Sequence, residues 1–292
     1  METNMSKLKV GLISMQFYDN RPKDSVGSSR IRGDWICKYW DECELYSTGK
    51  SYDVLIFQKS YWQDMVKRFK GIKIFDICDP DWLDHRPVVE IIRNCDGVVT
   101  SSEALAKQIR KFDIGGKPVL CIPDRVDLEW SKPVHGEHKG TAKSCVYFGY
   151  SNNANVVLDA TVDPLRNMGI ELTVISDQPY HSADHFVKYD ADTVNEELVK
   201  HDFILLPNAP SSNYRFKFKS NNKTVQAWAL GMPVVHDGED LKRFMKGEER
   251  EMERVLRLKE VKEKWDVRMS VVEWKLFIKE LIEIRGKNRK IG

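Results

Sequence analysis

Short apolar runs alternate with amphipathic stretches of helical periodicity along most of this 292-residue chain. Alternation of this kind predicts parallel β-sheets that are covered by helices on both faces. A stretch rich in Gly, Pro and His interrupts the alternation at residues 130–143, so the chain divides into two similar halves. The predicted strands are residues 9–14, 53–57, 72–77, 96–100 and 118–122 in the first half, and 144–148, 170–175, 186–189, 202–206 and 233–235 in the second.

The end of the chain predicts two helices. Residues 246–264 are dense in charge and indicate a solvent-exposed helix, whereas the following stretch has apolar residues at helical spacing and must bury one face. We expect this last helix to cross back to the first domain. The prediction is therefore an N-terminal Rossmann-like domain of residues 1–132 completed by residues 268–292, and a C-terminal Rossmann-like domain of residues 141–267. The apolar positions of the last helix are Val271, Trp274, Ile278, Leu281 and Ile282.

The composition is that of an ordinary globular protein, with 41% hydrophobic and 31% charged residues. A net charge of +2 is too small to attract the protein as a whole to nucleic acid or membranes, although local basic patches are still possible. The six cysteines form no CxxC pair and favour reduced thiols over disulfides or a metal knuckle. No apolar signal core begins the sequence, and no run approaches the roughly 20 apolar residues of a transmembrane helix. We expect a cytoplasmic protein, of a cell or of a viral host.

The most informative stretch is a basic loop between a predicted strand that ends at Pro207 and a predicted helix at residues 223–230. Free N–H groups at a helix N-terminus favour an anion, and neighbouring cations make the site suitable for a diphosphate. A capped helix with a solvated basic loop explains the same pattern equally well. The polar residues of this loop are Arg215, Lys217, Lys219, Ser220, Asn221, Asn222 and Lys223.

Two further polar stretches follow predicted strands of the first half. A loop at residues 18–25 leads to Gly27, Ser28, Arg30 and Arg32 at a predicted helix start, where glycine allows close approach of a ligand. The alternative is an ordinary capped helix.

The second polar stretch contains Asp79 and Asp81, just beyond a predicted strand. Ligand-contacting residues of parallel α/β sheets collect at carboxyl ends of strands, and either carboxylate can orient or deprotonate an acceptor hydroxyl. Asp-Pro-Asp is also a routine turn, and a metal site with Asp76 is a third reading.

Several common motifs are absent from the sequence. It has no GxxxxGK[ST], no GxSxG and no GxGxxG, which argues against P-loop enzymes, α/β-hydrolases and standard dinucleotide oxidoreductases. We expect no metal at the histidine pairs, which are His135 with His138 and His181 with His185.

Residues 219–235, KSNNKTVQAWALGMPVV, resemble the donor-binding segment of GT-B glycosyltransferases, in particular the family-4-like group. Other segments resemble elements of these enzymes in the same order along the chain, and together they cover most of residues 8–245. These segments are residues 96–105 (DGVVTSSEAL), 121–127 (CIPDRVD), 147–150 (YFGY) and 197–202 (ELVKHD).

The resemblance implies a GT-B fold and a transferase that needs no metal and no cofactor. The donor would be a UDP- or GDP-sugar, and the anomeric configuration would be retained. Asp79 and Lys219 are the candidate catalytic residues, and Lys219 with Lys223, or Arg215 as an alternate, would stabilise the leaving diphosphate. The candidate acceptor or cleft residues are Gly27, Ser28, Arg30 and Asp81. The candidate donor-binding residues are Gly149, Tyr150, Asp177, Arg215, Ser220, Asn221, Asn222, Lys223 and Gln226.

The chain departs from the family at two positions. Those enzymes usually carry two glutamates eight positions apart, and here the positions hold Phe218 and Gln226. A glutamine can still hydrogen-bond a ribose hydroxyl as donor and acceptor. The loss of the first glutamate bears directly on donor identity and on the implied retention.

The sequence leaves the acceptor open between a glycan, a lipid-linked acceptor and a hydroxymethylated base in DNA, as in some viral enzymes. The basic residues 285–290 are suited to contact a phosphate backbone. Two other functions are compatible with this fold: a non-catalytic protein that binds nucleotide-sugars or glycans, and a nucleotide-sugar epimerase.

Overall fold

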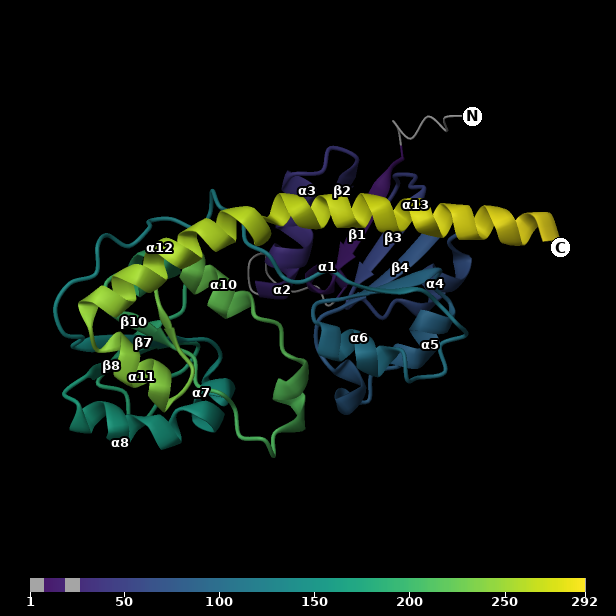
Figure 1. The fold of residues 1–292 in the computed structure, drawn as a ribbon. Coiled ribbons are helices and arrows are strands. Elements are labelled where there is room, and N and C mark those ends of the chain that lie inside the picture. The colour runs from purple at the N-terminus through teal and green to yellow at the C-terminus, as the bar shows by residue number, and fades with distance from the viewer. Residues whose placement is uncertain (1–7, 19–26, 292) are drawn as a thin grey trace. The chain divides into compact units, whose positions relative to one another are not determined.

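The computed structural model describes residues 8–18 and 27–291, which form two compact units (Figure 1). The first unit comprises residues 1–125, 215–221 and 267–292, and the second comprises residues 126–214 and 222–266. Residues 126–132 were expected in the first domain but pack with the second unit, and residues 215–221 were expected in the second domain but pack with the first. Apart from Tyr18, the polar loop expected at residues 18–25 lies outside the described residues.

The first unit contains a parallel sheet of six strands in the order β2-β1-β3-β4-β5-β6. Its central strands are buried along their length because helices cover both faces, as the continuous apolar runs predict. All five strands predicted for this half are present, and the short edge strand β2 was not predicted. The bounds are β1 (Val10–Ser14), β2 (Cys43–Leu45), β3 (Val54–Gln58), β4 (Ile72–Ile77), β5 (Gly97–Thr100) and β6 (Val119–Cys121).

The helices of the first unit lie on both faces of its sheet (Figure 1). The helix predicted to start near Ser28 is broken into short pieces around a π-helical turn, η1. The pieces are α2 (Gly27–Ser29), η1 (Arg30–Asp34) and α3 (Trp35–Lys38). The remaining helical elements are α1 (Met15–Tyr18), α4 (Gln63–Arg68), η2 (Asp81–Asp84), α5 (Val88–Arg93), α6 (Glu103–Ile109) and η3 (Tyr214–Phe218).

The last helix, α13 (Val267–Ile291), packs against α3 and β4 of the first unit (Figure 1). Its buried face includes Trp274 and Leu281, two of the positions that the helical spacing singled out. A Cβ at Gly97 would lie 2.9 Å from Phe277 and 3.0 Å from Leu281, so glycine in β5 allows the helix to approach the sheet.

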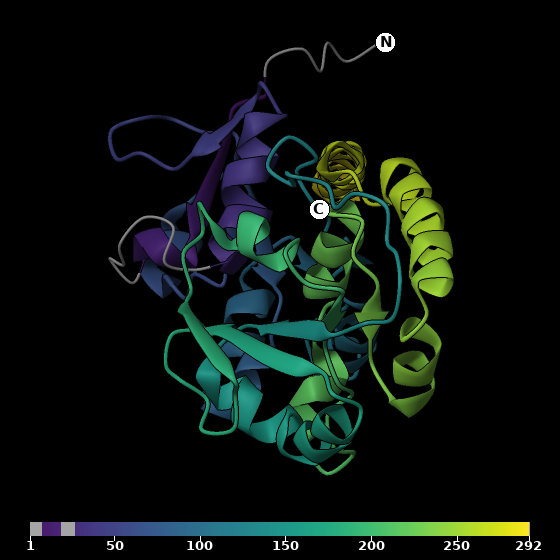
Figure 2. The ribbon, with the colours of Figure 1, turned by 90° about the vertical axis from the view of Figure 1, so that its left-hand side faces the viewer.

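The second unit repeats the architecture with a five-stranded parallel sheet in the order β11-β10-β7-β8-β9. Two layers of helices enclose it, α7 and α8 on one face and α10 and α12 on the other (Figures 1 and 2). The predicted fold class, two Rossmann-like halves with parallel sheets, is confirmed. The bounds are β7 (Ser144–Phe148), α7 (Ser151–Val157), α8 (Asp159–Asn167), β8 (Glu171–Ser176), β9 (His185–Lys188), α9 (Val194–Leu198), β10 (Phe203–Leu205), α10 (Asn222–Ala229), β11 (Val234–Val235), α11 (Gly238–Phe244) and α12 (Gly247–Lys264).

Within the described ranges, no helix combines the length and the apolar character that a bilayer crossing requires.

The buried face of α13 predicts a stability effect. Trp274 is 2% exposed and Leu276, on the same helix, is 63% exposed. We expect Trp274→Ala to lower the free energy of unfolding by about 3–5 kcal/mol, because it leaves a cavity in the core. Leu276→Ala is the matched control and should leave it nearly unchanged. Urea denaturation followed by circular dichroism measures both, and equal effects would contradict this packing.

Candidate functional site

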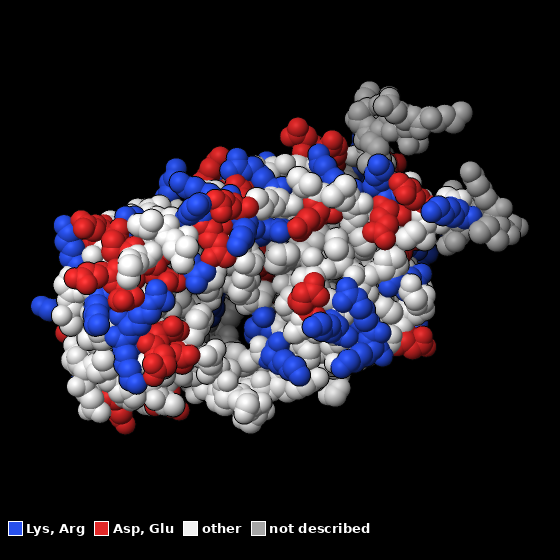
Figure 3. Space-filling model, in the orientation of Figure 1, with Lys and Arg blue, Asp and Glu red and all other residues white. Residues whose placement is uncertain are grey.

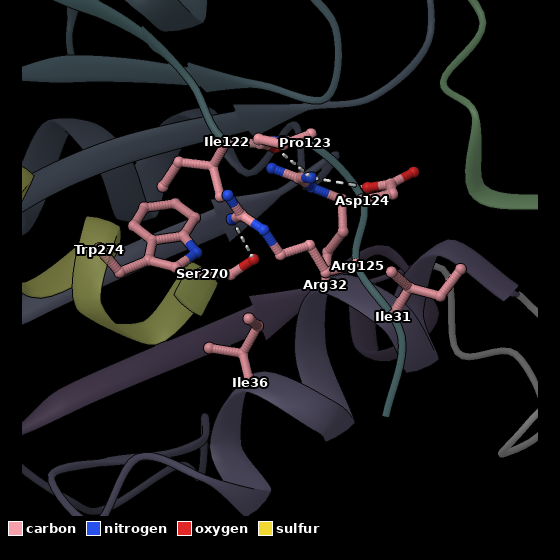
Figure 4. A pocket seen from close by; sticks show the side chains of 9 residues that line it. All are labelled: Ile31, Arg32, Ile36, Ile122, Pro123, Asp124, Arg125, Ser270 and Trp274. Carbon is pink, nitrogen blue, oxygen red and sulfur yellow. Dashed lines mark hydrogen bonds and ion pairs between the residues drawn. The ribbon is translucent and has the colours of Figure 1, made fainter. Parts of the chain in front are cut away.

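A buried ion cluster lies at the carboxyl ends of strands in the first unit. The guanidinium of Arg32, from η1, donates to Asp76 of β4 at 2.6–3.0 Å and to Asp124, just after β6, at 2.7 Å. It also donates to the carbonyl of Ile122 at 3.0 Å. Figure 4 shows Arg32 directed at Asp124, while the neighbouring Arg125 reaches Ser270 of α13. The cavity between these groups is about the size of one water molecule, so we assign it no ligand.

Burial and pairing act in opposite directions on this cluster. Burial alone would lower the pKa of Arg32, but the charges of Asp76 and Asp124 outweigh it and raise the pKa. Arg32 therefore remains a cation. Burial raises the pKa of Asp76, and the guanidinium beside it opposes that rise. Removing either aspartate would leave the buried guanidinium without full compensation, so the cluster holds the strand ends in a fixed arrangement.

A second, more accessible cluster surrounds Asp79, which follows β4. Its two carboxylate oxygens accept from Lys59 at 2.8 Å and from Lys219 at 3.1 Å. Burial alone would raise the pKa of Asp79, but the two lysines outweigh it and the pKa falls below its usual range. An ionised carboxylate of low basicity is better suited to orient a hydroxyl group than to remove its proton.

Lys59 also connects Asp79 to Asp81, which lies 3.2 Å from the ammonium group and accepts from the hydroxyl of Tyr61 at 2.8 Å. Burial raises the pKa of Asp81 despite these partners. Lys59 has a φ of 48°, a left-handed conformation that is uncommon for residues other than glycine. Such strain occurs preferentially at functional sites, which supports a role for this strand end.

The residues Arg215–Asn221, here called the basic segment, pack on the first unit. Arg215 forms a bidentate ion pair with Asp84, with N···O distances of 2.6 and 3.1 Å. Ser220 donates to Asp124 at 2.6 Å, and Lys219 pairs with Asp79 as described. Arg215, Lys219 and Ser220 were expected to bind the donor from the second domain. The structure instead pairs them with aspartates of the first unit, one of which is the candidate catalytic residue Asp79.

The other candidate acceptor residues lie at the start of the helical stretch after β1. Gly27 and Ser28 are half-buried, and a Cβ at Gly27 would meet no described atom within 4 Å. Arg30 is buried with its guanidinium 5.8 Å from the centre of the Trp35 ring, so it is not the exposed arginine that a capped helix would present.

In the second unit, four of the predicted donor-binding residues gather at the carboxyl ends of β7 and β8. The ammonium of Lys223 lies 5.1 Å from the centre of the Tyr147 ring and only 2.0 Å from where a Cβ of Gly149 would be. The φ of 146° favours glycine there, and a side chain at this position would displace the flexible end of Lys223. Tyr150 follows and is 57% exposed.

Asp177 completes this group. Its carboxylate accepts from the backbone N–H of Ser151 at 2.8 Å and from its hydroxyl at 3.3 Å, which holds the start of α7. These hydrogen bonds, first of all the backbone one, lower the pKa of Asp177, so it is ionised at neutral pH.

Gln226 lies one turn after Lys223 on α10 but is engaged within the unit. Its side-chain amide donates to Asn195 at 2.9 Å, and Asn195 in turn donates to the carbonyl of Trp130 at 2.8 Å. Asn221 and Asn222, half-buried, lie where the chain returns from the first unit to the second.

The three aspartates at the end of β4 and just after it are paired with cationic side chains of the protein. Asp76 contacts Arg32, and Asp79 and Asp81 contact Lys59. Among residues 8–18 and 27–291, no group of three or more His, Cys, Asp and Glu side chains is arranged to hold a metal ion.

Sequence reasoning missed Lys59 and Asp124 and underestimated Arg32. The signal that could have found Lys59 and Asp124 is positional, since each comes within two residues of the end of a predicted strand. Arg32 follows the first strand at a greater distance, and only the fold brings it back to β4.

The buried cluster predicts a large effect of a small substitution. We expect Asp76→Asn to lower the free energy of unfolding by about 3–5 kcal/mol, because it leaves the guanidinium of Arg32 buried with one carboxylate fewer. The control is Asp113→Asn, which removes an exposed pair with Arg93 and should leave the free energy of unfolding unchanged within error. Urea titrations of both variants test this, and similar stabilities would contradict the assigned role of Arg32.

No family model matches the sequence, and no curated protein is similar to it at a significant level. The structure, however, is similar to solved glycosyltransferase structures. HepE from Anabaena in complex with UDP-glucose matches with a TM-score of 0.65 at 10% identity, over 94% of this chain and 99% of HepE. AviGT4, a glycosyltransferase involved in avilamycin A biosynthesis, matches with a TM-score of 0.58 at 13% identity, over 94% of this chain and 98% of AviGT4.

TarM also matches, with a TM-score of 0.58 at 10% identity, over 77% of this chain. The match covers 54% of TarM, so this chain spans about half the length of that protein. At such low identities the likeness concerns the fold, and the fold is that of the GT-B glycosyltransferases.

Proposed function

We propose that this chain is a glycosyltransferase that moves a sugar from a nucleotide-sugar donor to an acceptor hydroxyl. The observation that carries the proposal is the group of Lys223, Gly149 and Asp177 at the strand ends of the second unit. The shared fold supports it, because solved complexes of HepE contain UDP and UDP-glucose. The donor is therefore a nucleoside diphosphate sugar, of uridine or guanosine, and no further cofactor takes part.

Lys223 is the residue we assign to the diphosphate. Negative charge accumulates on the departing phosphate as the sugar bond breaks, and a fixed cation lowers that barrier without a metal. The open backbone at Gly149 allows close approach of the phosphate, and the free N–H groups at the start of α10 add to the attraction. Lys219 does not share this role, because its charge is directed at Asp79.

On the acceptor side, we assign Asp79 to orient the attacking hydroxyl, with Lys59 and Lys219 holding the carboxylate in place. Retention of the anomeric configuration rests on the motif resemblance alone.

The acceptor class that the surface favours is anionic. Figure 3 shows Lys and Arg side chains gathered over α6 of the first unit, where Lys107, Arg110 and Lys111 are exposed. The phosphates of a DNA backbone would form ion pairs with these side chains, which favours a hydroxymethylated base in DNA over a neutral glycan as the acceptor. A salt-dependent mobility shift with duplex DNA separates the two acceptors.

A second candidate function follows from Phe218 and Gln226, which replace both family glutamates. A chain that binds a nucleotide-sugar but neither transfers nor hydrolyses it would be a binding protein with this fold. An epimer formed without any acceptor would instead indicate a nucleotide-sugar epimerase.

The donor assignment predicts a binding defect. A thermal-shift panel of UDP, GDP, ADP, CMP and their sugar conjugates first identifies the nucleotide, because ligand binding to the native state raises the melting temperature. Lys223→Met should then weaken binding of that nucleotide by about 10- to 100-fold, the loss expected for one charge-assisted contact.

The matched control is Lys188→Met, which removes an exposed lysine of the second unit at β9. Isothermal titration calorimetry compares the two variants with the wild type. Undiminished affinity of the Lys223→Met protein would rule out this donor site, and a melting temperature equal to that of the wild type would exclude unfolding as the cause of a loss.

A further inference from the structure

We infer that Phe218 is a positioning residue: it anchors the basic segment on the first unit and thereby places Lys219 against Asp79. The inference concerns the position that holds a glutamate in related enzymes and an aromatic ring here. Its catalytic part rests on the proposed function, and its structural part does not.

The anchor is apolar. Phe218 is 2% exposed and belongs to the main core cluster of the first unit. Its ring meets Trp82 edge to face with centroids 5.3 Å apart, and Trp82 meets Phe112 in the same way at 5.3 Å. Its backbone carbonyl accepts from the hydroxyl of Ser102 at 3.0 Å, at the start of α6. Aromatic pairs of this geometry contribute beyond their buried area, so this is the strongest hold on the segment.

Side chains on both sides of Phe218 bind polar partners on the same unit. Arg215 pairs with Asp84, Lys219 with Asp79 and Ser220 with Asp124. Exposed ion pairs such as the first contribute little on their own. They cannot replace the buried ring, but they orient the segment once the ring holds it.

The neighbouring Phe216 provides a contrast within the same segment. It lies two residues before Phe218 and is half-buried, whereas Phe218 is buried. The chain therefore contains an internal control for the loss of a phenyl ring in this stretch. Without Phe218, only polar contacts, such as the exposed contact between the ammonium of Lys219 and Asp79, would hold the segment in place.

The structural part is tested by limited trypsin digestion of the whole protein, since Lys217 and Lys219 are cleavage sites inside the segment. Mass spectrometry gives the rate of cleavage there relative to cleavage after Lys279, an exposed site on α13 of the same unit, away from the aromatic contacts of Phe218. We expect Phe218→Ala to raise this ratio by about tenfold or more, because the docked segment opens more often. Phe216→Ala and Phe218→Leu should leave it close to the wild-type value.

An unchanged ratio in Phe218→Ala would overturn the inference, and so would an equal rise in Phe216→Ala. Because the ratio is internal, a general loss of stability raises both rates and leaves the ratio unaffected. This test requires no turnover, so it remains decisive even if the protein proves not to be a transferase.

The catalytic part is tested by steady-state kinetics with the identified donor. Phe218→Ala should lower kcat by about 10- to 100-fold and leave the donor KM unchanged, because Lys223 and Gly149 keep their contacts. Lys219→Met should have a similar effect, and the double variant should be little worse than either single one, since both remove the same interaction. Phe218→Leu should restore most of kcat. Multiplicative losses in the double variant, or a rise in donor KM alone, would overturn the positioning role.

Discussion

The structure of the first unit depends on one buried cation. Arg32 joins the helical turn η1 to Asp76 in β4 and to Asp124 after β6, so a single guanidinium connects this turn to two strand ends. A buried ion pair contributes little net stability compared with an apolar packing, but it strongly penalises any arrangement that separates its members. Here it fixes Asp124, which in turn accepts a hydrogen bond from Ser220 of the basic segment. The buried charge therefore supports the orientation of that segment, which the ring of Phe218 anchors.

Under the proposed function, the cluster around Asp79 in the first unit and the group around Lys223 in the second have different roles. Around Asp79, two lysines balance two aspartates, so this cluster has an oriented carboxylate and little net charge to attract an anion. In the second unit, Lys223 lies against aromatic rings and an open glycine backbone. Under the proposed function, the second arrangement would attract the diphosphate and the first would orient the acceptor hydroxyl. The low pKa of Asp79 belongs to the same division, because a carboxylate that stays ionised can hold a hydroxyl over a wide pH range.

The sequence predicted what depends on local periodicity and missed what depends on distant contacts. Continuous apolar runs predicted the central strands, and helical spacing predicted the buried face of α13. The edge strand β2 was not predicted because it has no continuous apolar run and only one of its three residues is buried. The basic segment was assigned to the wrong unit because its anchors are remote: Ser102 and Phe218 are 116 residues apart in the chain. Lys59 and Asp124 follow predicted strands in the sequence, and only the assembled sheet brings them to Asp79 and Arg32.

The two positions that carry glutamates in related enzymes have become structural in this chain. Gln226 is bound to Asn195, and Phe218 is packed against Trp82. Neither side chain is disposed to select a sugar, so a transferase built on this chain has to recognise its donor elsewhere. The side chains exposed beside Lys223 are Tyr150, with its large ring, and Asp177, an ionised carboxylate that can accept hydrogen bonds from hydroxyl groups. Under the proposed function, donor selectivity would therefore rest on the strand ends of β7 and β8 and not on Phe218 of η3 or Gln226 of α10.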